Sequence, residues 1–297
     1  MKMLDAIDAF ERYQRDILGR SENTIKNYKL DLVQFCKVAG LDGIEDVSRA
    51  DAENFILWLA NKGTAASTRC RKISAIQSLF KWAEDCGIVQ KNAVGGLAKP
   101  KIPQKKVLAM SAEEVQKVLW VAKNRNQHHK DFFRNLTMIA LLFASGLRRN
   151  ELVNIKVGDV FLPDNALLVR EGKGDKQRIV YYNDDAKALL SEWIVRHRKL
   201  YKHAENSEYL FVTEKSEKMN PATVNMVVNG LYEEAGIKEK GYGVHSTRRS
   251  FATAVYDATK DVVVVQNLLG HSNPQVTMRY IGVDEGSKKQ AAQLVNF

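Results

Sequence analysis

The stretch His245-Ser-Thr-Arg-Arg-Ser-Phe-Ala-Thr253 combines a histidine, two adjacent arginines and short polar residues. His245 and Arg248 are three residues apart, so their side chains share one face if the segment is helical, whereas Arg249 points elsewhere. Taken alone, this pattern has an ordinary explanation, because single histidines are often structural and arginines mostly lie on the surface. Whether this stretch indicates a functional site therefore depends on the other basic and aromatic segments of the chain.

Two further segments combine glycine with basic residues, Ser145-Gly-Leu-Arg-Arg-Asn-Glu-Leu152 and Leu269-Gly-His271, and a third, Met278-Arg-Tyr280, places an arginine beside a tyrosine. In the first, Arg148 follows a glycine break, and Glu151 stands three residues beyond that arginine. The chain contains no P-loop, no G-x-G-x-x-G ahead of a helix, no H-E-x-x-H and no C-x-x-C. The sequence therefore predicts neither a nucleoside triphosphate site nor a metal site.

The composition is that of a basic globular protein. The 297 residues include 45 lysines and arginines against 35 aspartates and glutamates, which gives a net charge of +10 and a pI of about 9.3. This surplus indicates either a polyanionic partner such as a nucleic acid or a solvated basic surface. Hydrophobic residues make up 45% and charged residues 27%, which excludes disordered, collagen-like and coiled-coil chains.

Nothing in the sequence predicts a membrane span or an export signal. The longest apolar runs, such as Met138 to Ala144, are far shorter than the roughly 20 residues that cross a bilayer. The opening MKMLDAIDAFERYQ has early acidic residues and lacks the apolar region of a signal peptide. Cys36, Cys70 and Cys86 lack metal-ligand spacing, so we expect reduced core residues without disulfides or structural zinc. These features predict a cytoplasmic protein associated with the nucleoid if its partner is DNA.

The length favours two domains, and the clearest boundary lies at residues 98–107. This stretch, Ala-Lys-Pro-Lys-Ile-Pro-Gln-Lys-Lys-Val, holds two of the five prolines and four lysines, which is typical of an extended linker. We therefore predict one domain over 1–97 and another over 108–297. Residues 1–106 hold 18 basic and 13 acidic residues, and the remainder holds 27 and 22, so each part carries +5.

The first domain is predicted to be a bundle of four helices, because apolar residues recur every three or four positions along it. Ser48 and Asp51 are placed to cap the third helix. Tyr28, Trp58 and Trp82 fall at helical spacing and are interpreted as core residues rather than base-stacking residues. The basic residues off the apolar stripes are candidates for a solvated face or for DNA contacts: Lys26, Lys29, Arg69, Arg71 and Lys72.

The second domain is predicted to be mixed, with helices around a small β-hairpin. The hairpin is indicated by two apolar runs on either side of the turn Glu171-Gly-Lys-Gly-Asp-Lys176. In chain order, the expected elements are a helix capped by Ser111 and Glu114, a helix over 131–144, strands over 166–170 and 178–182, a third strand over 209–212, and helices from residue 221 onward.

Five motifs, in their order and spacing, resemble those of the tyrosine recombinases, also called the phage integrase family, and most closely the short Xer type. That family has G-L-R-x-S-E-L, G-K-G-x-K, H-x-L-R-R and L-G-H motifs, followed by a tyrosine. The matching residues are Gly146-Leu-Arg148 with Glu151-Leu152, Gly172-Lys173-Gly-Asp-Lys176, His245 with Arg248-Arg249, Leu269-Gly-His271, and Tyr280, nine residues after His271. Asn150 and Thr247 depart from the pattern, but neither replaces a charged residue.

The resemblance implies a mainly α-helical fold with a small β-hairpin or sheet. The N-terminal part would be a four-helix, SAM-like core-binding domain, and the second part a mixed α+β catalytic domain with a C-terminal exchange tail. The implied activity is site-specific recombination, in which duplex DNA is cut and rejoined through a covalent 3′-phosphotyrosine. This chemistry uses no ATP, metal ion or other cofactor.

In the reaction that the resemblance implies, Tyr280 is the nucleophile. A phenol with a pKa of about 10 is ionised to only about one part in 10³ at pH 7, so a base is needed, and His245 is the candidate. Negative charge builds on the non-bridging phosphate oxygens in the transition state. The guanidinium groups of Arg148 and Arg248 can bind both oxygens and stay charged at any working pH.

The remaining candidates in this reaction are also mostly basic. By the same resemblance, His271 would bind the phosphate or help position the arginines, and Lys173 would protonate the leaving 5′-oxygen. Lys176 is interpreted as a phosphate contact at the hairpin tip. For Glu151 two roles stay open, namely orienting Arg148 or simply capping and pairing.

The resemblance also implies double-stranded DNA as the partner, with one protomer on each recombination half-site. Four protomers, either identical or including a related recombinase, would assemble on the DNA. Residues 284–297 would dock on a neighbouring subunit or fold back on their own domain. The biological role stays open between resolution of chromosome dimers and integration or excision of a mobile element.

Three other functions are compatible with parts of the pattern. A type IB topoisomerase shares the tyrosine, arginine, histidine and lysine chemistry, but the helical first domain and the tail favour a recombinase. A non-enzymatic DNA-binding protein of the same fold would be marked by loss of Tyr280 or an arginine, and these residues are present. A helical interaction module unrelated to DNA would leave the basic residues unexplained.

Overall fold

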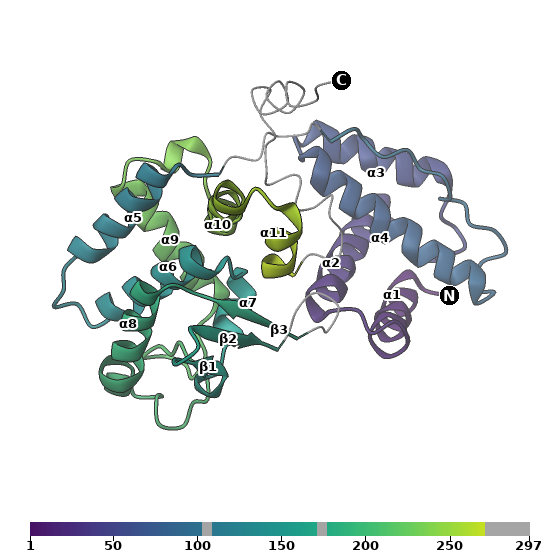
Figure 1. Cartoon of the computed structure of the whole chain (residues 1–297). Coiled ribbons are helices and arrows are strands. Elements are labelled where there is room, and N and C mark those ends of the chain that lie inside the picture. The colour runs from purple at the N-terminus through teal and green to yellow at the C-terminus, as the bar shows by residue number, and fades with distance from the viewer. Residues whose placement is uncertain (103–108, 171–176, 271–297) are drawn as a thin grey trace, which may run out of the picture. The chain divides into compact units, whose positions relative to one another are not determined.

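The computed structural model describes residues 1–102, 109–170 and 177–270. The chain forms two compact units, Met1–Lys105 and Lys106–Phe297 (Figure 1). The division between them falls inside the segment 98–107 that we predicted as a linker, and we retain that segment as the proposed boundary. The second half of the proposed linker, residues 103–107, lies outside the described residues.

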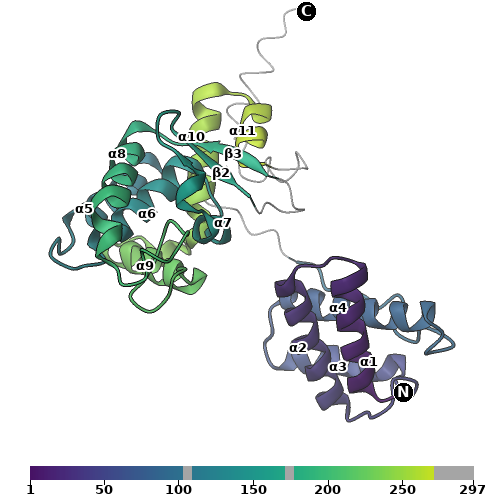
Figure 2. The ribbon, with the colours of Figure 1, turned by 90° about the horizontal axis from the view of Figure 1, so that it is seen from below.

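The first unit is a helical bundle, as predicted (Figure 2). Ser48 and Asp51 form a capping box, in which the Asp51 carboxylate accepts from the Ser48 backbone N–H at 2.9 Å. Gly40 ends the second helix in the left-handed conformation that favours glycine. The helices are α1 (Met3–Arg12, continued by a π-helical turn over Tyr13–Ile17), α2 (Glu22–Ala39), α3 (Arg49–Asn61) and α4 (Ala66–Asp85).

Aromatic side chains fill the centre of this first bundle. Phe35 of α2 and Phe55 of α3 are fully buried and pack edge to face, with ring centroids 5.3 Å apart. Trp82 is buried on α4, while Tyr28 and Trp58 are partly buried against the same core. The interpretation of these last three residues as core residues is therefore confirmed.

The three cysteines are all free, but they are less buried than expected. Cys36 and Cys70 are partly buried, and each thiol donates to a backbone carbonyl. Cys86 is exposed, so its prediction as a core residue was wrong. It is the C-cap residue directly after α4, where the apolar periodicity of that helix no longer applies.

A buried acid joins α2 to α4. The Asp31 carboxylate is 2% exposed and accepts from the Lys72 ammonium at 2.6 Å, while Arg71 pairs with its other oxygen. The same ammonium donates to Gln34 Oε1 at 2.6 Å. Lys72 is therefore buried, at 8% exposed, and lies neither on a solvated face nor on a DNA-contacting surface, the two alternatives that we predicted. The physical reason is that a buried carboxylate requires a nearby positive charge.

The second unit is built around α6, against which α5, α8 and α10 pack. Most of α6 is buried, which explains its apolar sequence around Met138 to Ala144. No helix within the described ranges is long and apolar enough to cross a membrane. The helices are α5 (Ala112–Asn124), α6 (Phe132–Ser145), α7 (Arg149–Asn154), α8 (Asp184–Glu192, continued by a π-helical turn over Trp193–His197), α9 (Pro221–Glu234), α10 (Val244–Thr259) and α11 (Val262–Leu269).

The sheet of this unit has three short antiparallel strands in the order β1-β2-β3: β1 (Val160–Phe161), β2 (Ala166–Val169) and β3 (Arg178–Tyr181). The predicted hairpin strands are confirmed and pair in the register Leu168 with Ile179. The turn between them, 171–176, lies outside the described residues. Among the other elements, α11 packs against β3.

The third predicted strand, over residues 209–212, was wrong. Tyr209 makes a single bridge to Lys156, and the following residues form no ladder. Leu210, Phe211 and Val212 are all fully buried, so this apolar run fills the core of the unit instead of alternating between a core face and a solvent face.

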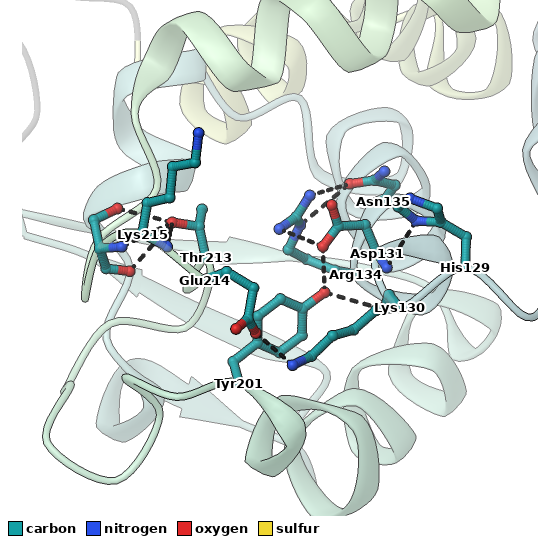
Figure 3. Close-up of polar contacts among 10 residues, drawn as sticks. His129, Lys130, Asp131, Arg134, Asn135, Tyr201, Thr213, Glu214 and Lys215 are labelled. Atoms are coloured by element: carbon teal, nitrogen blue, oxygen red, sulfur yellow. Dashed lines mark hydrogen bonds and ion pairs between the residues drawn. The ribbon is translucent and has the colours of Figure 1, made fainter.

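Polar contacts fix the start of α6 (Figure 3). The buried Tyr201 hydroxyl donates to the Asp131 carboxylate at 2.8 Å, and Arg134 forms an ion pair with the same carboxylate at 2.9 Å. Lys130 and Arg134 also lie over the Tyr201 ring. Burial raises the pKa of the Tyr201 phenol, so it stays a neutral donor.

The other end of α6 stops at Gly146, which has a φ of 63°. A Cβ at this position would lie 2.5 Å from a ring carbon of Phe251 on α10. Both the left-handed backbone and the contact with α10 therefore require glycine. As a result, the backbone after α6 has a fixed direction at Leu147 and Arg148.

Replacing Asp31 with alanine is expected to destabilise the first unit by about 3–5 kcal/mol, because the Lys72 ammonium would stay buried without its counter-charge. The loss in free energy of unfolding is measured by hydrogen exchange of α2 and α4 peptides in the full chain, followed by mass spectrometry across a urea series.

The matched control for this experiment is Asp8→Ala. It breaks an exposed ion pair with Lys29 and should cost less than about 1 kcal/mol. Combining Asp31→Leu with Lys72→Met should recover most of the lost protection, since no buried charge then remains. Equal losses for Asp31→Ala and Asp8→Ala would contradict the role of burial.

Candidate active site

Glu151, in the first turn of α7, is the centre of a buried ionic cluster. Its side chain is only 4% exposed. The carboxylate accepts from the backbone N–H of Arg148 at 2.7 Å and from the Nη1 of the same arginine at 2.7 Å. Both roles left open for Glu151 are thus present, because one carboxylate caps α7 and orients the Arg148 side chain.

Arg178, the first residue of β3, binds the same carboxylate in a bidentate arrangement. Its Nη1 and Nη2 donate to the two Glu151 oxygens at 2.9 and 2.8 Å. We did not predict this arginine as a site residue from the sequence. The available signal was a charged residue at the start of a strand that enters the core, but no local pattern names a partner 27 residues away.

The two arginines keep Glu151 ionised. Burial alone raises the pKa of this carboxyl group, but the hydrogen bonds and charge of Arg178, followed by those of Arg148, outweigh it and lower the pKa to about 2. Glu151 is therefore ionised at neutral pH.

Arg248 reaches this cluster from α10. It is 2% exposed, and its Nη1 donates to the Gly146 carbonyl at 2.7 Å while lying 3.8 Å from a Glu151 oxygen. Its Nη2 donates to the Leu269 carbonyl at the end of α11. The structure thus brings the predicted pair, Arg148 and Arg248, to one carboxylate.

His245 lies one turn before Arg248 and is exposed at the start of α10. Partial desolvation is the largest cause that lowers its pKa below the ordinary value of 6.5. Four positive charges act in the same direction, those of Arg249, Arg149, Arg248 and Arg148. The imidazole is therefore neutral at pH 7 and is able to accept a proton.

The cluster has an excess of positive charge. Among the described residues, three guanidinium groups, those of Arg148, Arg178 and Arg248, surround the one carboxylate of Glu151. Arg148 keeps 27% of its side chain exposed, so part of this charge is accessible from solvent. Such an arrangement suits an anion with several oxygen acceptors, such as a phosphate.

The other predicted site residues lie outside the described residues: Lys173, Lys176, His271 and Tyr280. The same holds for residues 284–297, which we predicted as an exchange tail. In the sequence, His271 directly follows Gly270 at the end of α11, and Lys173 precedes Arg178 by five residues.

The candidate DNA-binding residues of the first unit have different surroundings. Lys26 is exposed, and Arg69 is partly buried. Lys29 forms ion pairs with Asp8 at 2.9 Å and with Glu11 at 2.7 Å, whose hydrogen bonds raise its pKa. Together with the pairing of Arg71 and Lys72 to Asp31, these contacts mean that several of the basic residues already have acidic partners within the bundle.

Two family sequence models match the chain. "Phage integrase family" matches residues 109–286, and "Phage integrase, N-terminal SAM-like domain" matches residues 7–87. The chain belongs to the phage integrase family, the tyrosine recombinases. The recombinase is an enzyme that breaks and rejoins DNA strands in site-specific recombination. The predicted family, fold class and enzyme class are thus confirmed.

Full-length relatives agree with this family assignment. The recombinase is 32% identical over 292 residues to tyrosine recombinase XerA of Pyrococcus horikoshii, across 97% of this chain and 93% of that protein. It is also 32% identical over 296 residues to tyrosine recombinase XerD of Oceanobacillus iheyensis, across 97% of each.

Solved structures show the same fold. The XerH site-specific recombinase bound to a palindromic difH substrate, in a post-cleavage complex, matches with a TM-score of 0.75 and 24% identity, over 98% of this chain and 84% of that one. A crystal structure of XerA recombinase matches with a TM-score of 0.55 and 23% identity, over 99% and 100% of the two chains.

The cluster predicts how His245 titrates in the DNA-free recombinase. We expect its imidazole to titrate below pH 6.5, and Arg249→Gln to raise its pKa, because that substitution removes a nearby positive charge. NMR titration of the imidazole proton, assigned by its loss in His245→Gln, measures both values.

Arg196→Gln is the control for this titration. Arg196 is exposed, with 76% of its side chain accessible, and it is not among the charges that lower the pKa of His245. A pKa at or above 6.5 in the wild-type protein, or an equal response to both arginine substitutions, would show that the arginine cluster does not act on His245.

Proposed function

We propose that this recombinase cleaves DNA with Tyr280 as the nucleophile and with Arg148 and Arg248 as the clamp on the scissile phosphate. One observation carries the proposal: the guanidinium groups of both arginines lie at the same buried carboxylate, Glu151. Two arginines that share an anchor present their charge to one place, as a single phosphate requires.

We assign the two arginines different roles in binding the phosphate because their surroundings differ. The Arg148 side chain is held by one hydrogen bond to Glu151 and is partly exposed, so it meets the phosphate from the solvent side. Arg248 is enclosed and held by the carbonyls of Gly146 and Leu269. Donors that are fixed before the reaction spend no energy on reorientation when charge develops on the phosphate.

In the proposed step, the Tyr280 oxygen attacks the phosphorus atom and the bond from phosphorus to the 5′-oxygen breaks. The phenol proton passes to His245, whose neutral form at pH 7 is supported by its lowered pKa. Lys173 supplies a proton to the leaving 5′-oxygen, and His271 binds the phosphate. Rejoining is the reverse of these transfers, so the phosphodiester bond energy is kept in the phosphotyrosine.

We further propose double-stranded DNA half-sites as the substrate, with four protomers on two sites. The DNA-bound XerH relative of the same fold supports the duplex substrate. The exposed Lys26 of the first unit is a proposed phosphate contact, as are Lys176 and, in part, Arg69. Lys29 and Arg71 would contact DNA only by sharing their charge with the acids that they already bind.

A nicked suicide duplex tests the nucleophile. Sites are first enriched from a random duplex library by binding to the full chain, and then placed in a duplex whose cleavage releases a short fragment, so that rejoining is blocked. Wild-type protein is expected to form a covalent DNA adduct on a denaturing gel, and Tyr280→Phe none, because the attacking oxygen is missing.

Tyr256→Phe is the matched control, since Tyr256 is another tyrosine of the same unit and lies on α10. It should form the adduct at the wild-type level. An adduct that survives Tyr280→Phe would refute the assignment of the nucleophile, and an adduct lost equally in both variants would point to a general defect.

The role of Lys26 is tested by the salt dependence of DNA binding. Lys26→Ala is expected to weaken binding and to reduce the slope of log K against log salt by about 1, because one phosphate contact is lost. Lys81→Ala, which removes an exposed α4 lysine outside the proposed set, should leave the slope unchanged. Equal slopes for Lys26→Ala and the wild-type protein would remove Lys26 from the interface.

A further inference from the structure

Arg178 occupies a position that links three parts of the catalytic unit. It starts β3, its side chain is only 13% exposed, and both of its terminal nitrogens bind Glu151. Glu151 in turn holds Arg148 through a single Nη1 bond. The direction of the Arg148 guanidinium therefore depends on a carboxylate whose plane is set by Arg178.

Gly270 provides the second contact of Arg178. A Cβ on Gly270 would lie 2.6 Å from the Arg178 Cδ and 3.1 Å from its Nε, so the arginine stem runs directly against this glycine. Gly270 has a φ of 63° and ends α11, one residue before His271. The absence of a side chain at Gly270 is what leaves room for Arg178.

We propose that Arg178 is a positioning residue for strand cleavage, which fixes the Glu151 carboxylate so that Arg148 keeps one edge of its guanidinium available for the scissile phosphate. This proposal rests on the proposed role of Arg148 in the phosphate clamp. Through its packing against Gly270, Arg178 also ties the clamp to the turn that precedes His271.

The physical basis is competition for the two oxygens of Glu151. Arg178 takes both oxygens in a bidentate pair, which leaves Arg148 a single side-chain bond. A carboxylate without Arg178 has a free lone pair on each oxygen and can rotate, and Arg148 is then the nearest guanidinium able to form a bidentate pair. If Arg148 turned fully toward Glu151, the protein would stay folded and Arg148 would stay charged. Fewer of the Arg148 N–H groups would then face the phosphate.

The test uses full-length Arg178→Gln and Arg178→Lys on the suicide duplex described above. With protein in excess over DNA, Arg178→Gln is expected to slow cleavage about 10–100-fold, in line with the effect of misplacing a catalytic group. Its Kd for the duplex should change by less than about threefold, because bulk phosphate contacts are unaffected. Arg178→Lys should fall between, since a lysine keeps the charge but cannot span both oxygens.

Arg170→Gln is the matched control. Arg170 follows β2 and binds a buried carboxylate in the same sheet region, with its Nε and Nη2 at 2.7 and 2.6 Å from Asp159 Oδ1. Asp159 is 1% exposed, so this substitution also uncovers a buried acid, but one that holds neither clamp arginine. Arg170→Gln is expected to cleave at the wild-type rate.

A double-variant cycle with Glu151→Gln separates positioning from general destabilisation. If Arg178 acts through Glu151, the double variant should cleave no more slowly than the slower single variant. Multiplied losses in the double variant, or an equal rate loss in Arg170→Gln, would overturn the proposal. If Arg178→Gln fails to fold, Arg178→Lys carries the same test, and wild-type cleavage by that variant would refute it.

The outcomes also distinguish this proposal from the proposed function. If Arg148→Ala cleaves normally, the clamp assignment fails and the positioning role fails with it. If Arg148→Ala loses cleavage while Arg178→Gln keeps it, the clamp stands and only the role of Arg178 is refuted.

Discussion

The buried carboxylate of Glu151 is the group on which the arrangement of the catalytic unit depends. Removing an ionised carboxylate from water costs several kcal/mol unless opposite charges and hydrogen bonds surround it. Here these partners come from the residue before α7, from β3 and from α10. Because the buried Glu151 carboxylate needs hydrogen-bond donors and positive charge, three segments that are far apart in the sequence pack around it. The same contacts fix the orientations of their arginines.

The first unit uses a buried acid in the same way, but with a different result. Asp31 pairs with Arg71 and Lys72 and thereby joins α2 to α4. Two bases surround the one acid in that bundle, and three arginines surround Glu151, so the excess of positive charge is larger at Glu151. The net charge of +10 is consequently a poor guide to which lysines and arginines face a partner, because part of it neutralises buried carboxylates.

Local patterns predicted most of the fold. Helix starts with a serine cap and an acid three residues later, at Ser48 and Ser111, formed as expected because all the interacting atoms lie within one turn. The pairing of Arg148 with Glu151 is also a local contact. The partner of Arg178 could not be predicted, because it depends on how β3 packs against α7.

The errors have a similar cause. The apolar run from Tyr209 to Val212 looked like a strand because its residues are β-formers, but burial on all sides produces the same composition. Lys72 was predicted to lie on an exposed face, solvated or in contact with DNA, because only its own helix was considered, and the acid that it pairs with belongs to α2. In both cases the local sequence fits two structures equally well, and tertiary contacts decide which of them forms.

The hydrogen bonds of Arg248 determine when, during synthesis of the chain, the arginine pair can form. Its two terminal nitrogens bind the carbonyls of Gly146 and Leu269, which are 123 residues apart in the chain. During synthesis, the arginine cannot have both partners until residue 269 has been added and α11 has packed. A nascent chain that already contains Arg148, His245 and Arg248 therefore lacks the fixed arginine pair, and the assembled site cannot form before most of the chain has been synthesised.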